Sequence, residues 1–273
     1  MTLIVPDISW LKKTAEKFEK QPGLPNVNMA IKHLESHSWF SEAVGCLKNG
    51  SAQVLVSPMN ILPAYLPDEI VITALTPREN VEEILWIRKE AFNSAQFLKL
   101  NENAPVAVFS EMQKNQLRRF RPDLIADVFD PLSFDVNMSD KYSAFIASLD
   151  FFETYFEKNL FEKILLHPRE FMPAPGQGVT ACITMKDDFY TRRILKQIHH
   201  TATAMCTNVE RRFFQLSRQS GFPKPAVYCE RSAEGYFHAW AALENKPDSI
   251  SIRQLSAPVS QGLAENLFEL FMD

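Results

Sequence analysis

The stretch FMPAPGQG, Phe171–Gly178, limits the possible folds of this chain more than any other segment. It places two prolines and two glycines within eight residues, although the 273-residue chain has only 8 glycines in all. Proline lacks the backbone N–H donor and glycine loses the most backbone entropy on folding, so both are disfavoured inside helices and central strands. The run VTACITM, residues 179–185, follows at once and is typical of a buried strand. The pattern predicts a rigid, sharply shaped connector that leads into a sheet.

Apolar runs alternate with amphipathic segments along most of the chain, and this alternation predicts α/β units with a largely parallel sheet. Towards the C-terminus the pattern changes, and it predicts a small unit with an antiparallel sheet. The expected strands are at residues 2–5, 52–57, 66–75, 106–109, 179–185, 226–230, 236–243 and 249–255. The expected helices are at residues 6–18, 39–50, 111–120, 187–204, 207–219 and 260–272, and residues 143–156 predict a strand that runs into a helix.

Composition excludes several classes of function. The formal net charge of −4 gives no bulk basicity, so we expect no nucleic acid as partner. The basic segment KNQLRRFRPD, residues 114–123, is interpreted as a solvated helix face. No apolar stretch approaches 18 residues, so no membrane span is expected. The four cysteines form no CxxC pair, which favours a reducing compartment over a disulfide framework. We expect a cytoplasmic monomer.

Four segments together resemble the hydroxymethylbilane synthases, also called porphobilinogen deaminases. HPREFMPAPGQG (His167–Gly178) is similar to the signature at which the chain of that family returns from domain 2 to domain 1. Three more segments match family motifs in the same order and spacing. They are LPAYLPDEIVITALTPREN (Leu62–Asn80), NQLRRFRPDL (Asn115–Leu124) and VERRFF (Val209–Phe214). The resemblance spans roughly residues 35 to 230.

The resemblance implies an α/β fold of three domains. Domains 1 and 2 are arranged like a periplasmic-binding-protein pair around a cleft, and domain 3 is a small α+β domain that carries the cofactor of the family. We therefore expect domain 1 at residues 1–77 and 177–196, domain 2 at 78–176 and domain 3 at 197–273. Preset φ angles at Pro173 and Pro175 would fix the angle of the crossing between domains. The connector is thus interpreted as a hinge and scaffold element.

In the family, a cysteine in a G-G-C-x-V-P loop holds a dipyrromethane cofactor through a thioether. The matching stretch here is SGFPKP (Ser220–Pro225), which has Phe222 at the cysteine position. Phenylalanine cannot form a thioether, and Cys229, inside an expected strand, is interpreted as a buried core thiol. His199 and His200 are adjacent on an expected helix and point about 100° apart, so they are interpreted as helix surface. The sequence predicts no metal and no cofactor, with the dipyrromethane of the family absent.

The catalytic groups of the family are also substituted. Its aspartate lies in an H-S-x-K-D-x-P-T motif, which matches SPMNILPA and has Ile61 at the aspartate position. Its arginine pair in T-S-S-x-R-R-x-A-Q-L matches VFSEMQKNQL and is replaced by Met112 and Gln113. Near the N-terminus, Asp7 replaces a family arginine and His37 a family lysine. The resemblance thus implies that the carboxylate for cationic intermediates and the carboxylate-binding arginines are missing.

The polar side chains that remain near the cleft by this alignment are neutral, so we expect a ligand less anionic than the polycarboxylates of the family. No catalytic residue is predicted. The candidate cleft residues are Ser9, Ser57, Asn60, Ser110 and Gln113, with His37 as a further candidate.

We interpret the chain as a degenerate member of the family, linked by resemblance to tetrapyrrole and haem biosynthesis, without the usual deaminase activity. Three alternatives stay open. The first is an active synthase that uses altered residues. The second is a non-catalytic protein that binds a small molecule in the cleft, and the third is a regulatory partner of a haem-pathway protein. A cleft with convergent polar groups would favour the second, and an exposed apolar patch the third.

Overall fold

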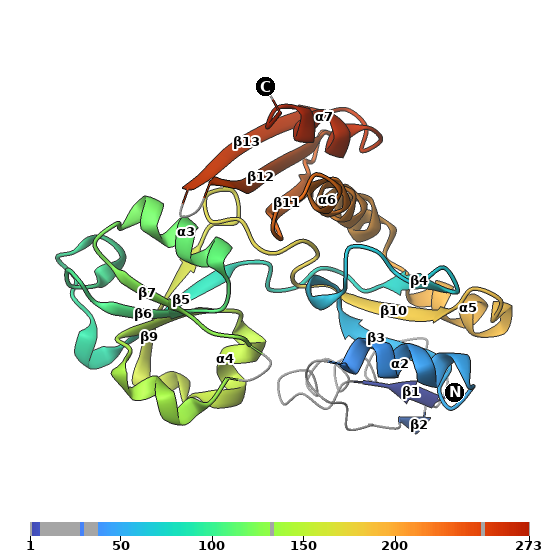
Figure 1. Cartoon of the computed structure of the whole chain (residues 1–273), viewed down its shortest axis with the longest axis horizontal. Helices are drawn as coiled ribbons and strands as arrows, with labels where there is room; N and C mark the ends of the chain where they lie inside the picture. Colours follow the sequence, from blue (N-terminus) through green and yellow to red (C-terminus); the bar gives the residue numbers. More distant parts are fainter. Residues whose placement is uncertain (1, 6–27, 30–37, 132–133, 247–248, 273) are drawn as a thin grey trace.

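The computed structural model describes residues 2–5, 28–29, 38–131, 134–246 and 249–272, and three β-sheets organise them (Figure 1). The helix expected at residues 6–18 lies outside these ranges, as do Asp7, Ser9 and His37. The chain builds most of the first sheet, crosses to build the second, returns to complete the first, and then forms the third. We call the units around these sheets domains 1, 2 and 3.

Domain 1 holds a five-stranded sheet in the order β2-β1-β3-β10-β4. β1 pairs in parallel with β2 and β3, and β10 runs antiparallel between β3 and β4. Helix α2 (Trp39–Lys48) buries its apolar face in a core shared with this sheet, and Gly50, with a φ of +74°, follows its end. The strands are β1 (Thr2–Ile4), β2 (Asn28–Met29), β3 (Val54–Pro58), β4 (Ile70–Leu75) and β10 (Thr180–Met185).

Domain 2 repeats this arrangement with a five-stranded sheet in the order β7-β6-β8-β5-β9. β6 pairs in parallel with β7 and β8, and β5 runs antiparallel between β8 and β9. Its helices are α3 (Glu111–Phe120) and α4 (Leu149–Tyr155). Its strands are β5 (Glu83–Arg88), β6 (Pro105–Val108), β7 (Ile125–Val128), β8 (Ala144–Ala147) and β9 (Phe161–Leu166).

The two five-stranded sheets are largely parallel, as expected, except that each includes one antiparallel strand, which follows a crossing between domains. The first crossing, residues 76–82, delivers β5 to domain 2, and the second, residues 167–179, delivers β10 back to domain 1. Each delivered strand is the fourth in its sheet order. Consequently the two crossings run between the same two sheets. Domains 1 and 2 form the two-lobed, periplasmic-binding-protein-like pair (Figure 1).

Domain 3 is a small α+β unit with an antiparallel sheet in the order β11-β12-β13. One face of the sheet packs against helices α6 and α7 through residues such as Phe213, Val227 and Leu267. The other face packs against Met112 of α3 and Met172 of the second crossing. Its elements are α6 (Thr201–Gln219), β11 (Ala226–Arg231), β12 (Phe237–Lys246), β13 (Ser249–Ala257) and α7 (Leu263–Glu269).

The single helix expected at residues 187–204 is wrong, and so is the place of the two histidines on it. Helix α5 (Phe189–Leu195) and a 3₁₀ turn, Lys196–Ile198, end before His199. The Nδ1 atom of His199 accepts a hydrogen bond of 3.2 Å from the backbone N–H of Leu75. His200 is the N-cap of α6, where its Nδ1 accepts from the N–H of Thr203. The pair therefore ends one helical segment and begins the next.

Candidate functional site

The two crossings meet domain 3 at one buried ion pair. Arg78 of the first crossing donates two hydrogen bonds, of 2.8 and 2.6 Å, to the carboxylate of Glu210 on α6. That carboxylate also accepts 2.8 Å bonds from the backbone N–H groups of Gly176 and Cys229. Since Glu210 is fully buried, these four bonds replace the water that it loses on folding. The group, which we call the Arg78–Glu210 node, joins all three domains.

The glycines of the second crossing are required by its close packing. Gly176 and Gly178 have φ angles of +79° and +75°, a region that favours glycine. A Cβ on Gly178 would lie 1.8 Å from the carbonyl oxygen of Glu79 in the first crossing. A Cβ on Gly176 would lie 2.6 Å from the Cγ atom of Met59. The sequence PAPGQG thus lets two backbones pass each other in contact.

Two glutamines fasten the second crossing, one to domain 2 and the other to the first crossing. Gln116 of α3 forms a pair of hydrogen bonds with the backbone of Met172, at 2.9 and 2.8 Å. Gln177 donates a 3.1 Å bond to the carbonyl of Val81 in the first crossing. Both glutamine side chains are buried, so these bonds fix the crossing in place.

A cavity of about 320 Å³ lies beside these crossings and is lined by residues of all three domains. Its apolar lining includes Ile61, Phe109, Met112, Phe151 and Met172. Its uncharged polar lining is Asn60, Ser110, Gln113, Gln116, Ser148 and Gln177, and its charged lining is Glu83, Glu111, Lys224 and Glu244. Lys224 is the one cationic side chain among the described lining residues.

Three of the expected cleft residues line this cavity, namely Asn60, Ser110 and Gln113. Ser110 is the N-cap of α3 and accepts a 3.1 Å bond from the N–H of Gln113. Gln113 in turn accepts a 2.6 Å bond from the N–H of Phe109. Ser57 is not brought to the cavity, because it is fully buried in β3 and its Oγ donates to the carbonyl of Pro58. Ser9 and His37 lie outside the described residues.

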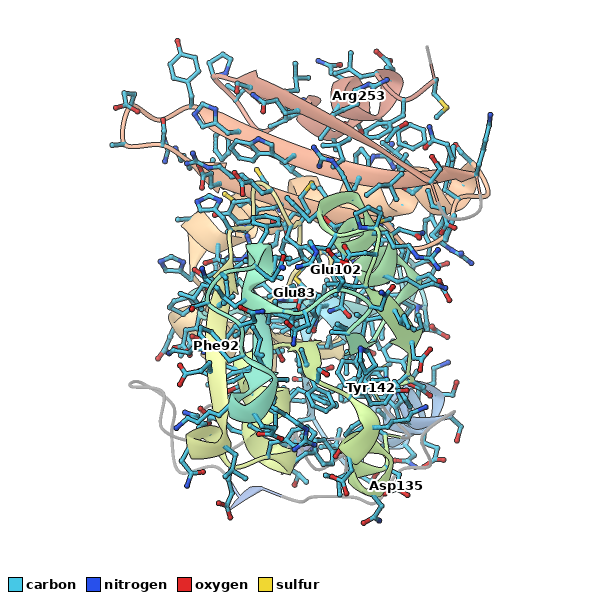
Figure 2. The ribbon with its side chains drawn as sticks, turned by 90° about the vertical axis from the view of Figure 1, so that its left-hand side faces the viewer. Glu83, Phe92, Glu102, Asp135, Tyr142 and Arg253 are labelled. Atoms are coloured by element: carbon cyan, nitrogen blue, oxygen red, sulfur yellow. The ribbon has the colours of Figure 1, made fainter. Side chains whose placement is uncertain are left out.

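Glu83 is a lining residue that the sequence analysis did not find. It begins β5 directly after the first crossing, and only 4% of it is exposed. Figure 2 places it well inside the molecule, below the sheet that carries Arg253. Burial raises the pKa of its carboxyl, although hydrogen bonds from Gln113 and Gln177 act in the opposite direction. The cavity therefore includes a desolvated carboxyl group.

Lys224 is the second residue that was missed. It lies in the loop between α6 and β11, and its Nζ donates a 2.5 Å hydrogen bond to the carbonyl of Asn60 in domain 1. The residue as a whole is exposed and lines the cavity, and its Nζ also lies 5.9 Å from the ring centroid of Phe214. Desolvation of the ammonium group lowers the pKa of Lys224 to about 8. The cavity lining thus carries a cation.

Different signals could have found these two residues. Lys224 lies in the SGFPKP loop, two residues after the anchor position, so the motif alone marked it as a cleft residue. Glu83 follows Glu82 in NVEEILW, and alternation along a strand predicts that one of the two faces inward. The sequence does not tell which one, because the start of β5 sets the register.

Among the helices that the structure describes, none is both long enough and apolar enough to cross a bilayer. Within the same described ranges, no three His, Cys, Asp or Glu side chains are grouped so that they could hold a metal ion.

The fold and site define a two-lobed α/β protein of the periplasmic-binding-protein type, with a third domain that closes a cavity at the crossings. Residues 25–193, more than half of the chain, match the family model described as porphobilinogen deaminase, dipyrromethane cofactor binding domain. The chain belongs to the porphobilinogen deaminase family.

Curated relatives of the chain include two bacterial proteins named porphobilinogen deaminase. The protein of Chlorobium luteolum is 30% identical over 201 residues, which cover 72% of this chain and 62% of the relative. The protein of Chloroherpeton thalassium is 30% identical over 197 residues, which cover 67% and 57%. The chain therefore matches about three-fifths of the length of these relatives.

Among solved structures, an ancestral cationic amino acid solute-binding protein is similar at a TM-score of 0.43 and 10% identity. That similarity covers 72% of this chain and 87% of the other.

The expectation of no cofactor is wrong. The matching family model describes the domain that binds the dipyrromethane cofactor, so membership points to a cofactor. The loop expected to anchor it nevertheless offers no thiol. Phe222 packs edge-on against Phe268 of α7, with ring centroids 6.2 Å apart. The four cysteines are buried and none forms a disulfide, and none is among the described lining residues. A thioether attachment at position 222 therefore does not fit the residues present.

Proposed function

We propose that this chain is a porphobilinogen deaminase family protein, linked to tetrapyrrole biosynthesis, that lacks the usual deaminase turnover and binds a small molecule in its cavity. The observation that carries the proposal is the identity of the lining at three positions. Ile61, Met112 and Gln113 line the cavity, and by resemblance they stand where the family has its aspartate and two arginines. The cavity is kept while the charged groups at these positions are replaced.

The substitutions remove what the reaction of the family requires. An isoleucine at position 61 offers neither negative charge to a developing cation nor a proton. Loss of such a carboxylate costs several kcal/mol of transition-state stabilisation, on the order of 10²–10³ or more in rate. Met112 and Gln113 cannot form the bidentate pairs with carboxylates that guanidinium groups form. We infer that growing polycarboxylate chains are not retained.

The polar groups around the cavity support small-molecule binding over a role as a regulatory partner. Amide and hydroxyl side chains from domains 1 and 2 converge on a mostly apolar cavity, which is the usual composition of a ligand site. We place this function in the cytoplasm, and the four cysteines, none of which forms a disulfide, support a reducing compartment.

Incubation with porphobilinogen tests the proposal. The purified protein and a complete enzyme of the family are assayed in parallel for hydroxymethylbilane, and the intact mass of both preparations is recorded first. The mass states which cofactor each preparation carries, so that low activity is not mistaken for incomplete loading. We expect no turnover above background from this chain. Sustained hydroxymethylbilane formation at a rate near that of the complete enzyme would overturn the proposal.

A further inference from the structure

Two of the four cysteines meet inside domain 3. Cys206 is on α6 and Cys229 is on β11, and both belong to the apolar core between these elements. The backbone N–H of Cys229 donates a 2.8 Å hydrogen bond to Glu210, which lies about one helical turn after Cys206. Residues four apart on a helix share a face, so Cys206 faces β11 close to Cys229. The two thiols contact each other through a hydrogen bond.

The surroundings of the two thiols give them different acidities. The hydrogen bond from Cys229 lowers the pKa of Cys206, and the charge of Arg78 acts in the same direction, against burial and the charge of Glu210. The same hydrogen bond, together with burial, raises the pKa of Cys229. Cys206 is also the more accessible residue, at 8% exposed against 1% for Cys229. Because the thiolate is the reactive form of cysteine, Cys206 is the thiol that reacts first.

The other two cysteines lie in domain 1 and belong to two separate cores. Cys46 is on α2 and packs in the core that this helix shares with the sheet. On β10, Ala181 and Ile183 face that same core, so Cys182 between them points to the opposite side of the sheet. Burial raises the pKa of Cys182. These two cysteines therefore serve as internal controls for the pair in domain 3.

We propose that Cys206 and Cys229 form a reversible dithiol–disulfide site that is oxidised by hydrogen peroxide. The Cys206 thiolate attacks one peroxide oxygen and the O–O bond breaks, which leaves a sulfenic acid on Cys206 and releases the other oxygen, with a proton, as water. The sulfur of Cys229 then attacks the sulfenic sulfur. The S–S bond forms, the S–O bond breaks, and the hydroxide takes the proton of Cys229 and leaves as a second water. Two thiols are oxidised and one peroxide is reduced.

The disulfide would connect two elements that meet at the Arg78–Glu210 node. Residues 207–228, between the two cysteines, include the loop that carries Lys224, a residue of the cavity lining. A disulfide restricts the conformations of the chain segment that it closes. Oxidation would therefore restrain a segment that lines the cavity, and reduction would release it.

Peptide mapping of the wild-type protein tests this inference. The reduced full chain is treated with increasing hydrogen peroxide, and the remaining thiols are blocked with N-ethylmaleimide in urea. We expect two of the four cysteines to lose the maleimide adduct together and a linked Cys206–Cys229 peptide to appear, which dithiothreitol removes. Met272 is exposed, so its sulfoxide shows that the peroxide dose was sufficient. Doses that oxidise Met272 without forming the linked peptide, or disulfides spread over all four cysteines, would overturn the inference.

Single substitutions then test the order of the two steps. Cys229→Ala should stop the reaction at the sulfenic acid of Cys206, which dimedone labels, and Cys206→Ala should lose both the label and the linked peptide. Cys46→Ala and Cys182→Ala are the matched controls and should form the linked peptide as the wild type does. Dimedone labelling of Cys229 in Cys206→Ala would contradict the assigned roles. Circular dichroism checks that each variant is folded, and if one is not, the wild-type map still decides.

Discussion

Gly178 is the residue at which the two crossings come closest. Its φ is +75°, and the carbonyl oxygen of Glu79 occupies the space of a Cβ. We expect Gly178→Ala to lower the free energy of unfolding by about 3 kcal/mol or more, from backbone strain and overpacking together. Urea unfolding followed by circular dichroism measures it. Gly50→Ala is the control, because Gly50 has a φ of +74° but nothing within 4 Å of its Cβ position, and should cost about 1–2 kcal/mol.

The ion pair of Asp123 with Arg121 makes the free energy of unfolding depend on pH. Hydrogen bonds from Arg121, at 2.8 and 2.6 Å, lower the pKa of Asp123 from 3.8 to about 2. Because the folded pKa is below the unfolded one, this contribution is present above about pH 4 and is lost as the pH falls towards 2. Arg121 also donates to the carbonyls of Leu100 and Asn101, so the pair fixes a loop of domain 2.

We therefore expect Asp123→Asn to be less stable than the wild type at pH 7 and to lose less stability between pH 4 and pH 2. Urea unfolding at a series of pH values measures both effects. Asp68→Asn, at an exposed position, is the control and should keep the pH dependence of the wild type. An unchanged acid limb in Asp123→Asn would contradict the prediction.

For single residues, the sequence predicts those site residues that lie in a recognisable motif. It misses those whose place is set only by packing. Alignment with the family motifs placed Ile61, Met112 and Gln113 at site positions, and all three line the cavity. The alignment works there because each residue lies at a fixed distance from a proline or a helix cap. It also chose Ser57, which the structure buries in β3. Glu83 needs the register of a strand, and this depends on residues far away in the sequence.

Helix α6 is the element that holds domain 3 to the crossings. Its Glu210 is fully buried and accepts hydrogen bonds from Arg78, Gly176 and Cys229. We expect Glu210→Gln to cost about 3–5 kcal/mol, since it leaves the Arg78 charge buried without its partner. The control is Glu265→Gln, which removes an exposed pair with Arg212 on the same helix and should cost about 0–1 kcal/mol. Similar losses in both variants, measured by urea unfolding, would contradict the prediction.

Secondary structure followed from local pattern wherever a cap or turn residue marked the end of an element. The observed ends at Gly50, after α2, and at Ser110, the N-cap of α3, lie within two residues of the expected ones. The break at His199 and His200 was missed because their contacts, with Leu75 and Thr203, are partly tertiary. The direction of β5 and β10 was missed as well, since strand direction depends on which sheet a crossing enters.

For the whole molecule, the Arg78–Glu210 node predicts that domain 3 responds as a unit. In Glu210→Gln we expect faster amide hydrogen exchange throughout β11, β12, β13 and α7. Exchange in β6, β7 and β8 of domain 2 should stay unchanged, because the node does not touch those strands. Hydrogen exchange followed by mass spectrometry distinguishes the two regions. Uniform acceleration over both sheets would show that the node does not delimit domain 3.

The place of β10 also constrains how this protein is made. In the sheet it lies between β3 and β4, yet β4 ends at Leu75 and β10 begins at Thr180. On the ribosome, β3 and β4 therefore emerge long before the strand that must separate them. The five strands of domain 2 come from the continuous stretch Glu83–Leu166 and can pair first. In a nascent chain that stalls before Thr180, the edges of β3 and β4 that face β10 stay unpaired, and such edges are the kind of surface on which chains aggregate.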